Sequence, residues 1–251
     1  MIRCSLDNMT LVSSTASFVS FVPELLDSGW DMTKRGGLVF NTYRQIDNKQ
    51  VKVRAIFMEM YHLPGQDNQG VRIEFNPNFI AIAEVVRRIS FLTMQNSFRL
   101  SRLDVAFDLV DEYNLHDYVI DLPRVKRNTH SSSSGKLETL YLGAPSSEKR
   151  LRVYDKRCER IAAGYSEFQL ASSWWRVEAQ LRSDSARNWQ NSLPAMIPTF
   201  TRFDELGERN RLIAYGVMSG FDMSFVSTKK LRTWRSIICS AQTDLRDILI
   251  S

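Results

Sequence analysis

The sequence predicts an α+β protein with a curved, mainly antiparallel sheet, helices on one face of that sheet and a helical C-terminal region. Two patterns support this class. Several segments alternate apolar and polar residues, as strands with one covered face do, and other segments place apolar residues three or four apart, as amphipathic helices do. We therefore predict an α+β domain over residues 1–195 and a helical region over residues 196–251.

The first ninety residues are predicted to alternate between strands and helices. A helix should follow the Ser13-Ser14-Thr15 cluster and run to Leu26, with Pro23 in its first turn. Gly36-Gly37 predicts a turn between two extended segments. The strands expected in this part are 9–13, 31–34, 38–44, 51–61 and 70–78, and a helix should carry residues 79–89.

Residues 101–109 form a strong predicted strand. Leu103, Val105, Phe107 and Leu109 are expected to face the core, and Arg102, Asp104, Ala106 and Asp108 are expected to face outward. The following polar stretch, residues 111–137, is predicted to be a flexible loop.

The next strands are predicted at 138–142, 150–156 and 174–182, the first two forming a hairpin. A short helix should run over residues 156–163 and end at Gly164. Ser183 is expected to cap a further helix. Beyond Pro198 the sequence predicts helices only, over residues 203–218 and 228–250.

The segment Arg150-Leu-Arg-Val-Tyr-Asp-Lys156 is the strongest candidate for chemistry. Alternation places Arg150, Arg152, Tyr154 and Lys156 on one face of the strand. Three cations there would hold a phosphate and favour ionisation of the phenol, whose ordinary pKa of about 10 makes it a poor nucleophile at neutral pH. We predict that Tyr154 attacks a DNA phosphodiester, displacing the 3′ oxygen and staying linked to the 5′ phosphate. The alternative is a solvated face of a basic protein.

Carboxylates on the outer faces of other strands predict a metal site. Asp104, Asp108 and Glu178 would repel one another if they met without a cation. Oxygen ligands with no nearby His or Cys suit Mg²⁺ or Mn²⁺, and such an ion would polarise the phosphate. For each carboxylate the alternative is a cross-strand ion pair with an arginine.

Composition and the absence of some motifs limit the kinds of protein that this chain can be. Lys and Arg outnumber Asp and Glu by 33 to 28, a weak indication of an anionic partner such as nucleic acid. The 3 cysteines form no CxxC pair, which favours a reducing cytoplasm. There is no apolar run of about 18 residues for a membrane span, no signal-peptide pattern, and no phosphate-binding GxxxxGK[ST] loop of an ATP-driven helicase.

Five ordered motifs resemble a known family. "VRIEFNPN" (71–78), "SRLDVAFD" (101–108), "ETLYLG" (138–143), "RLRVYDKRCER" (150–160) and "WWRVEAQLR" (174–182) are similar to the Rep_trans replication initiators of staphylococcal-type rolling-circle plasmids. Some relaxases of integrative conjugative elements and some phage initiators are related to them. The resemblance covers roughly residues 5–195.

The resemblance implies an endonuclease that nicks and rejoins DNA during plasmid replication. It assigns the nicking nucleophile to Tyr154, with Arg152 and Lys156 beside it, and implies that Asp104, Asp108 and Glu178 form a metal-dependent site with Mg²⁺ or Mn²⁺. The implied partners are double-stranded origin DNA, the nicked single strand, a second copy in a homodimer and a host helicase. The alternatives are a relaxase with the same chemistry and a DNA-binding regulator that has lost catalysis.

Further DNA contacts are predicted on cations outside the nucleophile. Arg150 and Arg176 belong to the sheet face just described. Lys229, Lys230, Arg232 and Arg235 open the last predicted helix and are candidates for contacts with the DNA backbone. A solvated basic face of a packing helix is the alternative for these four.

Overall fold

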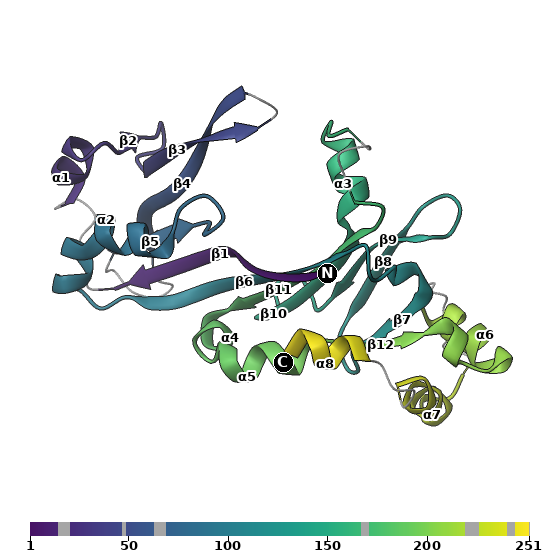
Figure 1. Ribbon diagram of the computed structural model, residues 1–251. Helices are drawn as coiled ribbons and strands as arrows, with labels where there is room; N and C mark the ends of the chain where they lie inside the picture. Colours follow the sequence, from purple (N-terminus) through teal and green to yellow (C-terminus); the bar gives the residue numbers. More distant parts are fainter. Residues whose placement is uncertain are drawn as a thin grey trace. The chain divides into compact units, whose positions relative to one another are not determined.

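The computed structural model describes residues 1–14, 21–46, 49–62, 69–166, 171–218, 226–239 and 244–250. It confirms the predicted class, a mixed fold with a large antiparallel sheet and helices (Figure 1). The chain divides into two compact units. The N-terminal unit comprises Ser5–Val105 with Leu181–Trp189, and the C-terminal unit comprises Met1–Cys4, Ala106–Gln180 and Gln190–Ser251.

In the N-terminal unit the strand order is β2-β3-β4-β5-β1-β6. The pairs β2/β3, β3/β4, β4/β5 and β5/β1 are antiparallel. The strands are β1 (Ile2–Ser13), β2 (Asp31–Met32), β3 (Leu38–Ile46), β4 (Lys49–His62), β5 (Gln69–Phe75) and β6 (Arg99–Val110). The helices are α1 (Val22–Asp27), α2 (Ile82–Gln95) and α4 (Ser183–Arg187), and the core gathers around fully buried residues such as Leu25, Ile56, Ile73 and Leu92.

In the C-terminal unit the end of β6 is followed in the sheet by β11, β10, β9 and β8. These strands are β8 (Arg127–Ser131), β9 (Leu137–Leu142), β10 (Lys149–Asp155) and β11 (Trp174–Arg182). A second sheet pairs β7 (Tyr118–Asp121) with β12 (Thr199–Arg202). The remaining elements are η2 (Leu115–Asp117), α3 (Lys156–Ala162), α5 (Trp189–Met196), η4 (Phe203–Glu205), α6 (Glu208–Met218), α7 (Thr228–Cys239) and α8 (Asp244–Ile250).

Two predictions about this unit are wrong. The predicted loop 111–137 contains η2, β7 and β8, and the predicted all-helical region contains β12. The backbone hydrogen bonds of β7 and β12 are satisfied by each other across about 80 residues of sequence, with Ile120 opposite Phe200, and β8 pairs with β9. Both errors therefore involve strands that form by pairing with another segment. The helices α6, α7 and α8 pack against this small sheet. The functional division at residue 195 stays a prediction.

Three smaller predictions also have an outcome. Ser183 is not a cap: the cap position is Arg182, whose side chain makes no capping hydrogen bond. The helix predicted over 228–250 is described as α7 and α8, with residues 240–243 outside the described part. The helix predicted to run to Leu26 is described from Val22 onward as α1, with Pro23 in its first turn, and residues 15–20 lie outside the described part. Among the described helices, none combines the length and apolarity that a membrane span needs.

Strand β6 departs from the predicted alternation in burial. The side chains predicted to face the core are buried. Asp104 (3% exposed), Ala106 (0%) and Asp108 (8%), which the alternation predicts to face outward, are buried as well. β6 is an inner strand of the sheet with β1 and β11 as its neighbours, and it has buried side chains on both faces. Burial of the two carboxylates therefore requires partners.

Candidate active site

The segment that carries Tyr154 is a strand joined directly to a helix. β10 pairs antiparallel with β9, with Tyr154 opposite Thr139 and Arg152 opposite Tyr141, as the predicted hairpin requires. The carboxylate of Asp155 then caps α3 by accepting a hydrogen bond of 2.9 Å from the backbone N–H of Cys158. The hairpin and the cap together fix the backbone on both sides of Tyr154.

Two cations contact the Tyr154 side chain. The guanidinium carbon of Arg152 lies 3.8 Å from the centroid of the Tyr154 ring, and the Lys156 ammonium donates to the phenol oxygen over 3.4 Å. Arg150 lies over a different ring, that of Tyr141, at 4.4 Å. The predicted grouping of Tyr154 with Arg152 and Lys156 is therefore present. Arg150 contacts Tyr141 instead of Tyr154.

Tyr154 and Lys156 are buried, so the alternative of a solvated face is wrong for these two residues, whereas Arg150 and Arg152 are partly exposed. Tyr154 is 3% exposed and Lys156 is 6% exposed. Burial raises the pKa of the Tyr154 phenol above its ordinary value, the negative charge of Glu178 raises it further, and Arg176 and Arg152 lower it by less. The expectation that the cations make this phenol easier to ionise is wrong, because burial outweighs them. At neutral pH the phenol holds its proton.

Lys156 is shared between the phenol and a carboxylate. Its ammonium forms an ion pair with Glu159 of α3, whose side chain is 44% exposed. Burial lowers the pKa of Lys156, and the hydrogen bond with Glu159 opposes this shift. Glu159 is thus paired with the cation that was assigned to phosphate from the sequence. This ion pair was not predicted from the sequence, although Glu159 follows Lys156 by three residues on the same helix.

Asp108 is held by a pair of donors from β11. Arg176 donates to both of its carboxylate oxygens, at 2.8 Å from Nε to Oδ1 and 2.7 Å from Nη2 to Oδ2, and the indole N–H of Trp174 donates to Oδ1 at 2.8 Å. The side chains of Asp108 and Arg176 are each 11% exposed. The cross-strand ion pair considered for each carboxylate is thus present at Asp108, and Arg176 is engaged with it.

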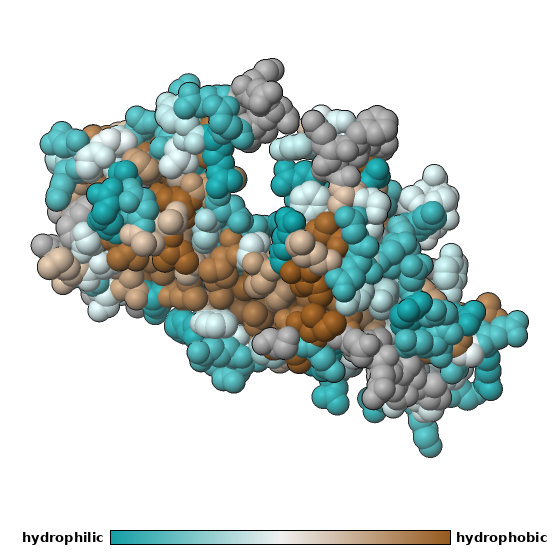
Figure 2. Space-filling model, viewed as in Figure 1, coloured by the Kyte–Doolittle hydropathy of each residue, from teal (hydrophilic) through white to brown (hydrophobic). Residues whose placement is uncertain are grey.

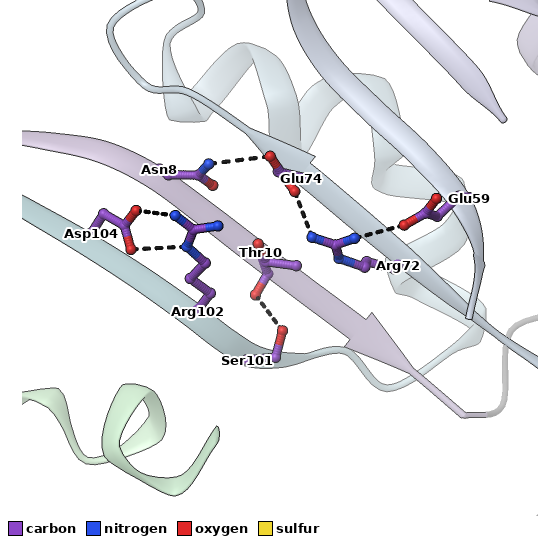
Figure 3. A network of polar contacts seen from close by, with 8 residues as sticks. All are labelled: Asn8, Thr10, Glu59, Arg72, Glu74, Ser101, Arg102 and Asp104. Atoms are coloured by element: carbon purple, nitrogen blue, oxygen red, sulfur yellow. Dashed lines mark hydrogen bonds and ion pairs between the residues drawn. The ribbon is translucent and has the colours of Figure 1, made fainter. Parts of the chain in front are cut away.

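Asp104 belongs to a separate polar network in the N-terminal unit (Figure 3). Arg102 donates to both of its oxygens, at 3.0 Å and 2.6 Å. On the neighbouring strands Arg72 bridges Glu59 and Glu74, each at 2.6 Å. Figure 3 shows each of these carboxylates pointing at a guanidinium group.

The predicted three-carboxylate metal site is not preformed. Among the described residues no group of three or more His, Cys, Asp and Glu side chains is placed to hold an ion. Asp104 and Asp108 each face an arginine fork, while Glu178 is half-buried on β11 and acts electrostatically on Tyr154. In this arrangement the three carboxylates do not form a common metal site, and their assignment as ligands stays a prediction.

The C-terminal cations are accessible. Lys229, Lys230 and Arg232 are exposed on α7, and the Arg235 side chain lies outside the described residues. Arg232 also lines a cavity of about 590 Å³ together with Arg124, which lies in the loop between β7 and β8. Their contacts with DNA stay predictions.

The part of the chain that carries Tyr154 resembles a known protein family. The family described as "Replication initiation factor" matches residues 124–205, which include Tyr154 and Glu178. A replication initiation protein of Staphylococcus aureus is 32% identical over 203 residues, covering 75% of this chain and 59% of that protein. The predicted resemblance to the replication initiation factors is confirmed.

Two further matches cover different shares of the chain. A second replication initiation protein of Staphylococcus aureus is 30% identical over 149 residues, which are 57% of this chain. The matched part of the chain spans 46% to 59% of the lengths of these two relatives. A rolling circle replication initiator protein from Geobacillus stearothermophilus aligns over 95% of this chain and 97% of its own, with a TM-score of 0.43 and 17% identity.

Proposed function

We propose that this chain is a rolling-circle replication initiator that nicks one strand of a double-stranded origin through Tyr154 and later rejoins DNA. The observation that carries the proposal is the Tyr154 side chain held between Arg152 and Lys156, within the part that matches the replication initiation factors. The relatives named as replication initiation proteins support the biological setting.

In the proposed reaction the phenol oxygen of Tyr154 forms a bond to phosphorus while the bond from phosphorus to the 3′ oxygen breaks. The phenol proton leaves, the 3′ oxygen takes up a proton, and the 5′ phosphate stays on the tyrosine. No bond energy is lost to water, so attack by a 3′ hydroxyl reverses the step and rejoins the strand. Arg152 and Lys156 compensate the charge that grows on the phosphoryl oxygens.

Burial of Tyr154 requires that side chains shift when DNA binds. Glu159 is the partly exposed member of this group, and its carboxylate holds the ammonium of Lys156. An incoming phosphate would take the place of Glu159 on Lys156. Glu178, whose negative charge raises the pKa of the Tyr154 phenol, is the carboxylate that we propose accepts the phenol proton.

The remaining parts of the proposal concern partners. We include a requirement for Mg²⁺ or Mn²⁺, a homodimer, a host helicase, a cytoplasmic location and backbone contacts from Lys229, Lys230 and Arg232. A relaxase would use the same chemistry on a conjugative element, and the genes beside this one would separate the two. An inactive regulator is disfavoured by the intact contacts of Tyr154 with Arg152 and Lys156.

Nicking of a supercoiled plasmid tests the proposal. The plasmid carries the gene with its flanking DNA, and the protein is added with Mg²⁺ or Mn²⁺. Wild type should produce nicked circles, and Tyr154→Phe should produce none. Tyr141→Phe is the matched control, because this tyrosine lies on the paired strand and stacks with Arg150, yet it has no role in the proposed attack. Equal nicking by Tyr154→Phe and wild type would exclude the mechanism.

A further inference from the structure

The outer half of the β3–β4 hairpin is an exposed two-stranded ribbon. The register shifts between Phe40 and Asn41, where Ala55 is the extra residue of a β-bulge. Before the bulge the partners Phe40 and Ile56 belong to the core of the N-terminal unit, and beyond it Tyr43 is 61% exposed. Figure 1 shows these two strands running past the other elements of their unit.

The two faces of this ribbon differ. One face carries Asn41, Tyr43 and Gln45 of β3 opposite Arg54, Lys52 and Gln50 of β4, and we call these six residues the polar face. The other face rests on the unit itself. There the Thr42 hydroxyl donates to the backbone oxygen of Phe79 at 3.4 Å, and the Arg44 guanidinium lies 5.2 Å from the Phe79 ring centroid. The polar face points away from Phe79. At its base Asn41 and Lys52 contact the exposed carboxylate of Asp31, and Arg54 lies over the Phe57 ring.

Charge along the polar face favours an anionic partner. Two of the six residues of the polar face, Lys52 and Arg54, are cations, and none of the six is a carboxylate. At the base of the ribbon Arg54 lines a cavity of about 760 Å³ together with Lys34 and Arg35 of the β2–β3 turn. Glu59 and Glu74 line the same cavity and are paired with Arg72. In the described part of the chain, neither Lys34 nor Arg35 has a carboxylate within ion-pair distance. Lys52 is paired with Asp31 at 3.2 Å, an exposed contact that a phosphate could replace.

The remaining side chains of the polar face suit a base edge. Gln45 and Gln50 lie opposite each other near the end of the ribbon, with Asn41 and the phenol of Tyr43 behind them. Amide side chains form paired hydrogen bonds with adenine in the major groove. The part of the ribbon visible in Figure 2 is coloured hydrophilic to neutral, in keeping with a surface that binds a polar partner.

The dimensions of the ribbon match the major groove of duplex DNA. Six residues of each strand beyond the bulge extend about 20 Å, and the groove is about 12 Å wide and admits a two-stranded ribbon. A two-stranded ribbon without a core of its own is at most marginally stable, and binding along its length would order it.

We propose that the polar face of the β3–β4 ribbon enters the major groove of the duplex origin, with Lys52 and Arg54 on phosphates and Gln45 and Gln50 on base edges. This inference rests on the proposed function, because it assigns the duplex-recognition surface of the same initiator. It is independent of Tyr154, so the two can fail separately.

Binding to the flanking duplex, measured by fluorescence anisotropy in EDTA, tests the phosphate contacts. The double variant Lys52→Gln/Arg54→Gln should bind about tenfold to thirtyfold more weakly. The slope of log affinity against log salt should fall by about 2. Arg44→Gln removes a cation from the opposite face of the same ribbon and should stay within about twofold of wild type. A double variant that binds like wild type, or an equal loss in Arg44→Gln, overturns the proposal.

The base contacts have their own test. Gln45→Ala/Gln50→Ala should reduce the preference for the origin duplex over a scrambled duplex by about tenfold, with an unchanged salt slope. An unchanged preference for the origin duplex overturns this assignment. A ribbon that binds a protein partner and no duplex also overturns it. Thermal unfolding should be the same for all variants.

Cleavage of a single-stranded oligonucleotide that spans the nick separates the two proposals. The ribbon variants should cleave it as wild type does. Loss of duplex binding with normal single-strand cleavage supports the ribbon proposal, whereas normal cleavage by Tyr154→Phe contradicts the proposed function alone.

Discussion

The ion pair between Asp108 and Arg176 makes a prediction whose sign separates two roles for the carboxylate. In Asp108→Asn the buried guanidinium loses the negative charge that it contacts through two hydrogen bonds. Breaking a buried pair in this way costs about 3–5 kcal/mol, and we expect about 3 kcal/mol because asparagine keeps one acceptor. For a chain of this size that corresponds to a fall of roughly 10 °C in the unfolding midpoint.

The opposite sign is expected if Asp108 is one of several mutually repelling metal ligands. Neutralising one carboxylate of such a cluster would stabilise the metal-free protein. The unfolding midpoint of Asp108→Asn, measured by calorimetry in EDTA at pH 7.5, decides between the role of ion-pair partner and the role of metal ligand. Asp204→Asn is the matched control, because it breaks the contact of Asp204 with Arg202, an arginine fork of the same kind whose side chains are 60% and 51% exposed. Its midpoint should barely change. An unchanged or raised midpoint for Asp108→Asn would refute the structural role.

Two further predictions follow from the surroundings of Tyr154. Burial and Glu178 raise the pKa of the phenol, so the phenolate fraction should grow as the pH rises towards that pKa. The single-turnover nicking rate should therefore rise through pH 7–9 by up to tenfold per pH unit. A flat pH profile would contradict ionisation of the phenol before attack. Glu159→Gln frees Lys156 for phosphate, so single-stranded DNA should bind more tightly in an anisotropy titration, and weaker binding would show that Glu159 does not compete with DNA.

The local parts of the site could be predicted from the sequence. The β9–β10 hairpin and the placement of Tyr154 beside Arg152 and Lys156 follow from alternation over seven residues, which is a property of the strand itself. The capped start of α3 directly after β10 is equally local.

The long-range parts could not be predicted in the same way. The raised pKa of Tyr154 depends on what covers it, including Glu178 from β11, and alternation says which face a residue is on but not whether that face is covered. Asp108 meets Arg176 across 68 positions of sequence, and the β7–β12 pairing joins segments about 80 positions apart. The sequence offered both partners of the ion pair on outer faces but no signal that β6 and β11 are neighbours.

Isolation of the covalent intermediate tests the central proposal most directly. After reaction with the flanking duplex or the single-stranded substrate, the protein–DNA adduct is digested with nuclease and protease, and mass spectrometry locates the attached nucleotide. The account predicts a 5′-phosphoryl group on the peptide that contains Tyr154. A phosphoryl group on any other residue, or nicked DNA with a free 5′ phosphate and no adduct, would contradict it.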